Sequence, residues 1–286
     1  MLLTVITPTY NRAYLLKRLY SSLLAQTERD FEWVVIDDGS DDFTEMLIGG
    51  FIGEGKIPVI YKKIGHSGKP QAHNEGVALA RGTLSVCVDS DDFLTEDAVA
   101  HIRRAWEACE PHNIGLIAPR IDTEGNRLCS PLCDGESVTF DTLYNSRGFS
   151  GDTALIFKTD ILRENPFPRF DNESFIPEDA LYFTLDKYGA MRVTDTPIYI
   201  TEYLDDGLSR GYLALLRKNP MGTAYSYYVK AMRSGGFFKR IKYATVSESY
   251  LKLSGRVAEY ERKYPLWLIA PAKLMRPLYM MKKGLK

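Results

Sequence analysis

The sequence predicts an α/β fold in which a mostly parallel sheet is flanked by helices, followed by a C-terminal helical appendage. Two observations carry this prediction. Short apolar runs alternate with amphipathic stretches through the first half of the 286-residue chain, which is the order of repeated βαβ units. From about residue 211 onward Tyr, Lys and Arg dominate at helical spacing. We therefore expect an α/β domain over residues 1–210 and a basic, mostly helical extension over residues 211–286.

Seven runs of apolar and β-branched residues predict strands. They lie at residues 2–7, 31–37, 57–62, 84–89, 114–119, 154–158 and 197–203. We expect Pro8 to end the first of them, because proline has no backbone N–H to donate within a sheet. Residues 122–151 are polar and rich in turn-forming residues, so the regular alternation weakens there.

Four stretches between these strands predict helices. They lie at residues 14–26, 70–82, 95–109 and 177–188. The first carries leucines on one helical face. The second opens with Pro70 as its first residue and closes with Gly82 as a C-cap, and the third has Thr95 as an N-cap followed by acidic residues.

Composition is that of an ordinary globular protein, with 45% hydrophobic and 26% charged residues. The net charge of −1 hides an asymmetry, because residues 230–286 contain 14 Lys and Arg against 3 Glu, a net of +11, which leaves −12 for residues 1–229. No signal-peptide pattern is recognised at the start, so we expect a cytoplasmic protein. The four cysteines are too few and too irregular for a disulfide framework, and no second pair completes a zinc site.

Polar loops follow three of the predicted strands. The first strand leads into TPTYNR, the second into IDDGSDD and the fourth into VDSDDF. Because the carboxyl ends of parallel strands face the ligand-binding crevice of such folds, we expect these loops to share one site.

Three carboxylates, Asp89, Asp91 and Asp92, come directly after a predicted buried strand. Acids this close raise one another's pKa unless a cation or hydrogen-bond donors balance them. Their oxygens suit Mg²⁺ or Mn²⁺, which complete their shells with water and substrate phosphates. An isolated D-x-D is more often a solvated turn, but the second acidic loop, at Asp37 and Asp38, favours the cation site.

The segments TVITPTYNR, VVIDDGSDD, GKPQAHNEG and VCVDSDDFL, in this order and spacing, resemble the family 2 glycosyltransferases, which have the nucleotide-binding GT-A fold. The resemblance is strong over residues 3–100. Farther on, FPRFDNESFIPEDALYF and ITEYLDDGLSR look like a bacterial branch of that family associated with capsule, lipopolysaccharide and other surface glycans.

The resemblance implies a nucleotide-binding set and a metal-binding set. The nucleotide-binding residues are Thr7, Pro8, Tyr10, Asp37, Asp38, Lys69 and Asp89. Asp38 is expected to hydrogen-bond the uracil ring or ribose, and Asp37 to share that task. Asp91, together with Asp89, is expected to bind the Mn²⁺ or Mg²⁺ that bridges the two phosphates. Asp92 is expected to lie next to the ion without coordinating it directly.

The resemblance also places the catalytic base in the pair Glu178 and Asp179, of which we favour Asp179, although the two could exchange roles. A base is needed because a sugar hydroxyl is a poor nucleophile until its proton is removed. Acids in the first turn of a helix also stabilise it, so capping is the alternative interpretation. With no histidine beyond residue 112, the third metal ligand is left to Asp152, Asp205 or water, and Arg210 is a candidate to neutralise the departing diphosphate.

The basic extension mixes cations with aromatic and aliphatic residues and lacks a nucleic-acid-binding motif. Its apolar run from residue 264 to 281 is too interrupted to span a membrane but suits an interfacial segment on an anionic membrane. A helix pair packed on the domain, with lysines extended to solvent, explains the pattern equally well.

Together these features predict an inverting, metal-dependent glycosyltransferase that uses a nucleotide-sugar donor, a UDP-sugar, and a glycan or lipid-linked saccharide acceptor, with no nucleic-acid partner. We expect it in the cytoplasm, with peripheral attachment to the inner face of the membrane. A sugar-phosphate nucleotidyltransferase is one alternative, although TPTYNR has no glycine to cradle a triphosphate. A non-catalytic protein that binds glycans or nucleotide sugars is the other.

Overall fold

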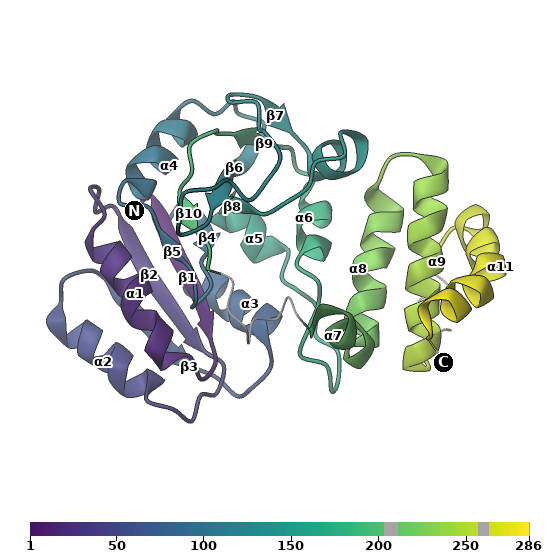
Figure 1. The fold of residues 1–286 in the computed structure, drawn as a ribbon, viewed down its shortest axis with the longest axis horizontal. Helices are drawn as coiled ribbons and strands as arrows, with labels where there is room; N and C mark the ends of the chain where they lie inside the picture. The colour runs from purple at the N-terminus through teal and green to yellow at the C-terminus, as the bar shows by residue number, and fades with distance from the viewer. Residues whose placement is uncertain (203–210, 257–262, 286) are drawn as a thin grey trace. The chain divides into compact units, whose positions relative to one another are not determined.

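The computed structural model describes residues 1–202, 211–256 and 263–285, which divide into two compact units (Figure 1). The N-terminal unit consists of Met1–Pro166 and Tyr188–Leu204, and the C-terminal unit of Phe167–Lys187 and Asp205–Lys286. Residues 167–187 thus cluster with the C-terminal helices, whereas the sequence predicts them in the first domain. The domain boundary that the sequence predicts between residues 210 and 211 remains a prediction, because residues 203–210 lie outside the described part of the chain.

In the described part of the N-terminal unit, ten strands form one sheet (Figure 1). They are β1 (Leu3–Thr9), β2 (Phe31–Asp37), β3 (Val59–Lys63), β4 (Leu84–Cys87), β5 (Phe93–Leu94), β6 (Asn113–Ile121), β7 (Ser137–Val138), β8 (Thr153–Lys158), β9 (Ala190–Val193) and β10 (Tyr199–Ile200). The order is β3-β2-β1-β4-β8-β6-β10-β5, with β9 beside β6 and β7 beside β9. Strands β1 to β4 are parallel, and β8 pairs antiparallel with β4 and β6. The predicted α/β fold is confirmed.

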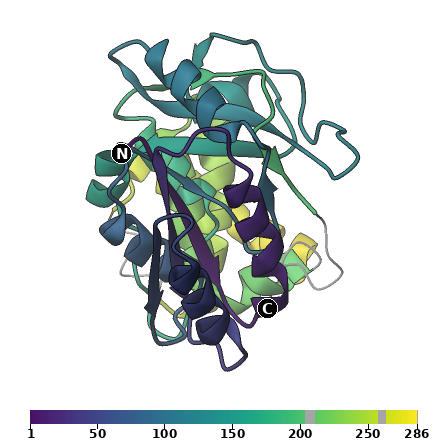
Figure 2. The same cartoon turned by 90° about the vertical axis from the view of Figure 1, so that its left-hand side faces the viewer.

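Helices cover both faces of the parallel strands (Figures 1 and 2). They are α1 (Ala13–Leu24), α2 (Thr44–Glu54), α3 (Lys69–Leu79), α4 (Ala98–Glu107) and α5 (Thr159–Glu164). Because side chains alternate along a strand, Val5 and Trp33 face the core shared with α1 and α2, while Val34 and Ile36 pack with Ala72 of α3. This double cover holds the carboxyl ends of β1, β2 and β4 at one edge.

Gly76 allows α3 to lie close to the sheet. A Cβ added there would lie 2.3 Å from Ile6 Cγ2 and 3.5 Å from Ile36 Cγ1. The helix therefore approaches β1 more closely than any residue with a side chain would permit.

The structure corrects several predicted boundaries. Strand β1 continues through Pro8 to Thr9. Strand β1 pairs with β4 only as far as Ile6, so the N–H that Pro8 lacks would have had no acceptor in β4. Helix α3 ends at Leu79 rather than Gly82. Helix α4 begins at Ala98 with Asp97 at its N-cap position, so Thr95 is not the cap.

The prediction missed helix α2. Its sequence contains three glycines, which lower helix propensity, yet Ile48 and Phe51 are buried against the sheet. Tertiary packing therefore stabilises a helix that the local sequence disfavours. The polar segment after β6 also holds β7 and a short π-helix, η1 (Asp141–Ser146).

The C-terminal unit is mostly helical in its described residues, and the helices from residue 211 onward agree with the expected helical extension. It contains α6 (Asp179–Leu185), α7 (Tyr212–Lys218), α8 (Pro220–Arg233), α9 (Phe237–Ser254) and α11 (Leu266–Lys283). Helix α8 packs against α6 and α9, and α9 packs against α11 (Figure 1). None of the helices described in either unit combines the length and the apolar composition that crossing a bilayer requires.

Candidate functional site

The loops after β1 and β2 are tied together by side chains. Asn11, which has a positive φ of 52°, donates its backbone N–H to Ser40 Oγ at 2.8 Å and accepts the Asp41 N–H at its Oδ1 at 2.9 Å. Asp42 Oδ2 accepts the backbone N–H of Ala13 at 3.0 Å, at the start of α1. The two polar loops that the sequence placed at one edge thus form a single ordered structure.

Asp37 has an internal role in this structure. The side chain is fully buried, its Oδ1 accepts the Ser40 N–H at 2.7 Å, and its Oδ2 accepts the Tyr61 hydroxyl at 2.6 Å. Burial and the hydrogen bond to Asp37 raise the pKa of Tyr61, so its hydroxyl keeps the proton that it donates. Asp37 therefore orders the loop that carries Asp38.

Asp38 joins the loop after β2 to the loop after β3. Its Oδ1 accepts the Ser67 N–H at 2.7 Å and its Oδ2 accepts the Gly68 N–H at 2.9 Å. His66 Nδ1 lies 2.9 Å from the same Oδ2. Gly39, with φ of 86°, allows the backbones of the two loops to approach, because a Cβ there would lie 3.0 Å from the backbone nitrogen of His66.

Of Thr7, Pro8 and Tyr10, which the resemblance assigns to nucleotide binding, Tyr10 reaches the surface. Its ring stacks on that of His66 with centroids 4.3 Å apart, and 44% of the residue is exposed. Thr7 and Pro8 are buried in β1, and the Thr7 hydroxyl accepts the Trp33 indole N–H at 2.9 Å. Sequence reasoning assigned no role to His66; its position beside a Gly-Lys loop was the signal available.

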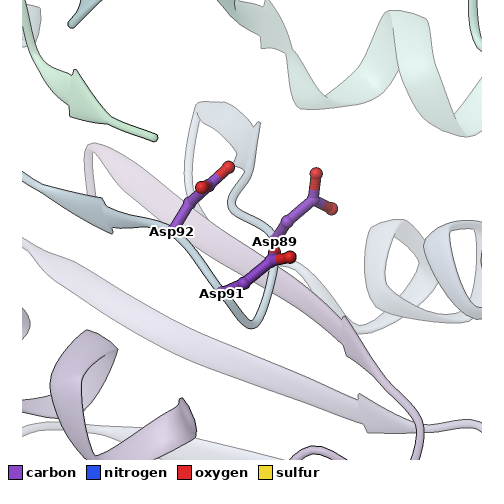
Figure 3. Close-up of side chains that lie close together, drawn as sticks. All are labelled: Asp89, Asp91 and Asp92. Carbon is purple, nitrogen blue, oxygen red and sulfur yellow. The ribbon is translucent and has the colours of Figure 1, made fainter. Parts of the chain in front are cut away.

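Among the described residues, Asp89, Asp91 and Asp92 form a group whose ligand atoms lie within 4.8 Å of one another (Figure 3). All three belong to the turn between β4 and β5, and Figure 3 shows the carboxylates of Asp89 and Asp91 close together. Burial, and after it the charge of Asp89, raise the pKa of Asp91. A divalent cation fits this donor set, because it would offset both effects.

Asp92 is a structural anchor of that turn. The residue is 4% exposed, its Oδ2 accepts the Tyr199 hydroxyl at 2.8 Å, and its Oδ1 accepts the Glu202 N–H at 3.1 Å. The Tyr199 oxygen also accepts the Asp89 N–H at 3.0 Å. Burial, and after it the charge of Asp89, raise the pKa of Asp92 to about 7, while Arg120, 3.5 Å away, opposes the shift. Asp92 and Tyr199 together therefore hold the turn that carries Asp89 and Asp91.

Cations from neighbouring elements meet the acidic turn. Lys69 Nζ lies 2.5 Å from Asp89 Oδ1. Arg12 is close enough to lower the pKa of Asp91 in part. Arg18 of α1 donates to the Asp91 carbonyl oxygen, pairs with Glu202, and lies over the Phe93 ring at 4.7 Å. A substrate bearing phosphates would meet fixed cations as well as the acids.

The predicted base pair lies at the start of α6 in the C-terminal unit. Asp179 Oδ1 accepts the Ser226 hydroxyl at 2.7 Å, and its Oδ2 pairs with Lys230. Glu178 Oε2 accepts the Tyr182 hydroxyl at 2.9 Å. The structure shows, for the residues that it describes, no side-chain hydrogen bond that caps the N-terminus of α6. The alternative interpretation, that these acids cap the helix, is therefore not supported by a hydrogen bond.

Two other sequence candidates, Asp205 and Arg210, lie outside the described residues. Asp152 precedes β8 and is exposed. It is not a member of the acidic group formed by the described residues.

A family model described as Glycosyl transferase family 2 matches residues 4–163. Among characterised proteins, the chain is 28% identical over 207 residues to the poly(ribitol-phosphate) beta-N-acetylglucosaminyltransferase TarP of Staphylococcus aureus. That match covers 69% of this chain and 62% of the relative, so the chain spans less than two thirds of that protein's length.

Solved structures share the fold. S. aureus TarS 1–349 in complex with UDP-GlcNAc superposes with a TM-score of 0.57 at 18% identity, covering 99% of this chain and 92% of TarS 1–349. A mannosyltransferase from Pyrobaculum calidifontis, in complex with GDP-Man and Mn²⁺, gives a TM-score of 0.56 at 19% identity, covering 99% and 83%. At these identities the likeness establishes the architecture.

Proposed function

This chain belongs to glycosyl transferase family 2, and from that premise we propose that it transfers a sugar from a nucleotide-sugar donor to an acceptor hydroxyl. The donor is a UDP-sugar and the acceptor a glycan or lipid-linked saccharide of a bacterial surface polysaccharide. Similarity to TarP, and a shared fold with TarS, which was solved with UDP-GlcNAc, support this substrate class. We place the reaction in the cytoplasm.

One connected set of contacts carries the proposal. Asp38 accepts the N–H of Gly68, and the next residue, Lys69, pairs with Asp89 of the acidic turn. This path joins the loop expected to recognise the nucleoside to the turn expected to hold the phosphates. A nucleoside diphosphate needs both kinds of group within its own length, because its base and its charged phosphates lie at opposite ends.

Each residue then has a distinct part. The Tyr10 and His66 rings offer a flat surface to the base. Asp38 is 4% exposed and already accepts the Ser67 and Gly68 N–H groups, so it would use its remaining acceptor site for one hydrogen bond from the base or ribose. Asp91, with Asp89, would hold Mn²⁺ or Mg²⁺, and a divalent cation at that position stabilises the charge of a departing diphosphate. Lys69 adds a fixed positive charge at the same place.

The catalytic base in this proposal is Asp179, with Glu178 as the alternative. Ser226 and Lys230 orient the Asp179 carboxylate, which supports its use as a fixed proton acceptor. Direct attack by the deprotonated acceptor would invert the anomeric centre in one displacement. No covalent sugar intermediate is required.

The test is release of nucleoside diphosphate from a panel of nucleotide sugars, with Mn²⁺, Mg²⁺ or EDTA. We expect the best donor, with UDP-GlcNAc tested first, to be turned over with metal and to lose at least about a hundredfold in rate with EDTA. Asp91→Asn should abolish the metal response. Asp179→Asn should lower kcat by about a hundredfold or more, with donor affinity retained.

The matched control is Asp160→Asn, because Asp160 is an exposed acid outside the proposed site and should leave turnover unchanged. Pyrophosphate release from NTP and sugar phosphate would instead identify a nucleotidyltransferase. Full turnover in both Asp91→Asn and Asp179→Asn would contradict the assigned roles. Loss of activity in Glu178→Gln alone would move the base to Glu178.

A further inference from the structure

Helix α11 carries two apolar faces. One packs into the C-terminal unit through Leu268, Ile269, Ala272 and Met280. The other is exposed, with Leu266 and Leu274 each 83% exposed, Met281 75% and Leu278 64%. At about 100° per residue, the exposed four occupy one sector of roughly 120°. A continuous apolar stripe along a surface helix is unfavourable in water and indicates a partner.

The stripe continues onto the start of α9. Phe237 of α9 stacks on Trp267 of α11 with ring centroids 5.8 Å apart, and Arg240 lies over the Trp267 ring at 4.7 Å. Phe238, next along the chain, is 84% exposed. Aromatic rings beside cations at one end of an apolar stripe are typical of side chains at the boundary between lipid headgroups and acyl chains.

The described helices α9 and α11 carry mostly positive charge. Helices α9 and α11 contain eight Lys and Arg, and their one acid, Glu248, is fully buried 3.4 Å from Arg276. On the helical projection, Lys273 and Lys282 flank the stripe on its two sides. Both lysines are exposed, which suits their extension toward anionic headgroups.

These features favour a lipid surface over a second copy of the chain. Two copies joined through this face would bring two cationic surfaces together, whereas anionic lipids neutralise them. The 18-residue α11 is interrupted by Pro271 and Pro277 and is not a candidate span, so it would lie in the plane of the bilayer.

We propose that the exposed face of α11, together with Phe237 and Phe238, is an interfacial docking surface for an anionic membrane. Leu266, Leu274, Leu278 and Met281 enter the acyl boundary, and Lys273 and Lys282 contact anionic headgroups. The inference concerns attachment alone and stands independently of the transfer reaction.

The test is sedimentation of the full chain with phosphatidylcholine vesicles that contain or lack phosphatidylglycerol. We expect binding to the anionic vesicles at least about tenfold tighter than to the neutral ones, and weaker binding as salt is raised. Leu274→Glu combined with Leu278→Glu should weaken binding at least about tenfold. Lys273→Gln combined with Lys282→Gln should reduce the preference for phosphatidylglycerol and leave the weak neutral binding unchanged.

The matched control is Met46→Glu combined with Ile52→Glu, which places the same two charges on exposed apolar residues of α2 in the N-terminal unit and should bind as the wild type. Circular dichroism and thermal unfolding establish that each variant is folded. Wild-type protein that stays in the supernatant, or a leucine variant that binds fully, would overturn the proposal. A dimer by light scattering that the leucine substitutions dissociate would assign the face to a second copy instead.

Turnover with a water-soluble acceptor separates this inference from the proposed function. The leucine variant should release nucleoside diphosphate at the wild-type rate while losing vesicle binding. A wild type that binds vesicles but turns over no donor would refute the transfer reaction and leave the docking surface supported.

Discussion

Replacing Tyr199 by Phe should loosen the acidic turn without changing any acid. The side chain is fully buried, and its hydroxyl donates to Asp92 Oδ2 at 2.8 Å and accepts the Asp89 N–H at 3.0 Å. Burial raises the pKa of Tyr199 well above its usual value, so the hydroxyl stays protonated. Phenylalanine keeps the ring that lies 3.9 Å from the Arg120 guanidinium carbon. The substitution therefore tests the hydroxyl alone.

The expected loss follows from those two hydrogen bonds. A neutral bond contributes about 1 kcal/mol and one to a charged group about 2 kcal/mol, and both partners would be left poorly satisfied. We expect the free energy of unfolding to fall by about 3 kcal/mol and the Tm by roughly 5–10 °C. Because Asp89 and Asp91 lose their anchor, affinity for UDP in the presence of Mn²⁺ should fall about tenfold.

Urea unfolding, thermal unfolding and UDP titration measure these effects. Tyr188→Phe is the matched control, because its hydroxyl bonds Asn165 at an exposed position, and it should cost less than about 0.5 kcal/mol. If Tyr199→Phe cost no more than this control and bound UDP normally, the anchoring role assigned to Tyr199 and Asp92 would be wrong.

Three further substitutions and one control test the fold. Gly76→Ala should destabilise by about 2 kcal/mol in urea unfolding, because its methyl would lie 2.3 Å from a β1 side chain, whereas Gly49→Ala, with open space around it, should be neutral or stabilising. Glu173→Ala should lower the Tm by removing a carboxylate that accepts two N–H groups, at 2.8 Å each, in the first turn of α8; a loss of about 1–2 kcal/mol is expected, and an unchanged Tm would refute the capping role. The hydrogen bond from Arg103 lowers the pKa of Asp30 below its usual value of 3.8. The ionised Asp30 carboxylate therefore stabilises the folded state above pH 3.8, and this stabilisation is lost as the pH falls through the lowered pKa. Asp30→Asn should therefore reduce stability by about 0.5 kcal/mol near neutral pH and have no effect in strong acid; an equal loss at both would exclude this linkage.

Local sequence identified most of the α/β unit. The apolar run of β2 and the leucines at helical spacing in α1 depend on near neighbours, so their pattern is visible along the chain. Helix α2 was missed because its glycines argue against a helix, and burial of Ile48 and Phe51 decides otherwise. The continuation of strand β1 through Pro8 is likewise a tertiary effect. Only the pairing with β4, which ends at Ile6, shows that no backbone hydrogen bond is lost at Pro8.

What the sequence by itself determined is the chemistry available at one edge of the sheet: the acids at the end of β2 and after β4, the Gly-Lys loop and the family to which they belong. The tertiary structure decided how those acids divide their tasks. Asp37 is held by Tyr61, 24 residues away, and Asp92 by Tyr199, 107 residues away. Asp38 is also buried and is held by the N–H groups of Ser67 and Gly68, whereas Asp89 and Asp91 stay partly exposed. The physical reason is that burial and hydrogen bonding set the role of a carboxylate, and distant parts of the chain supply both.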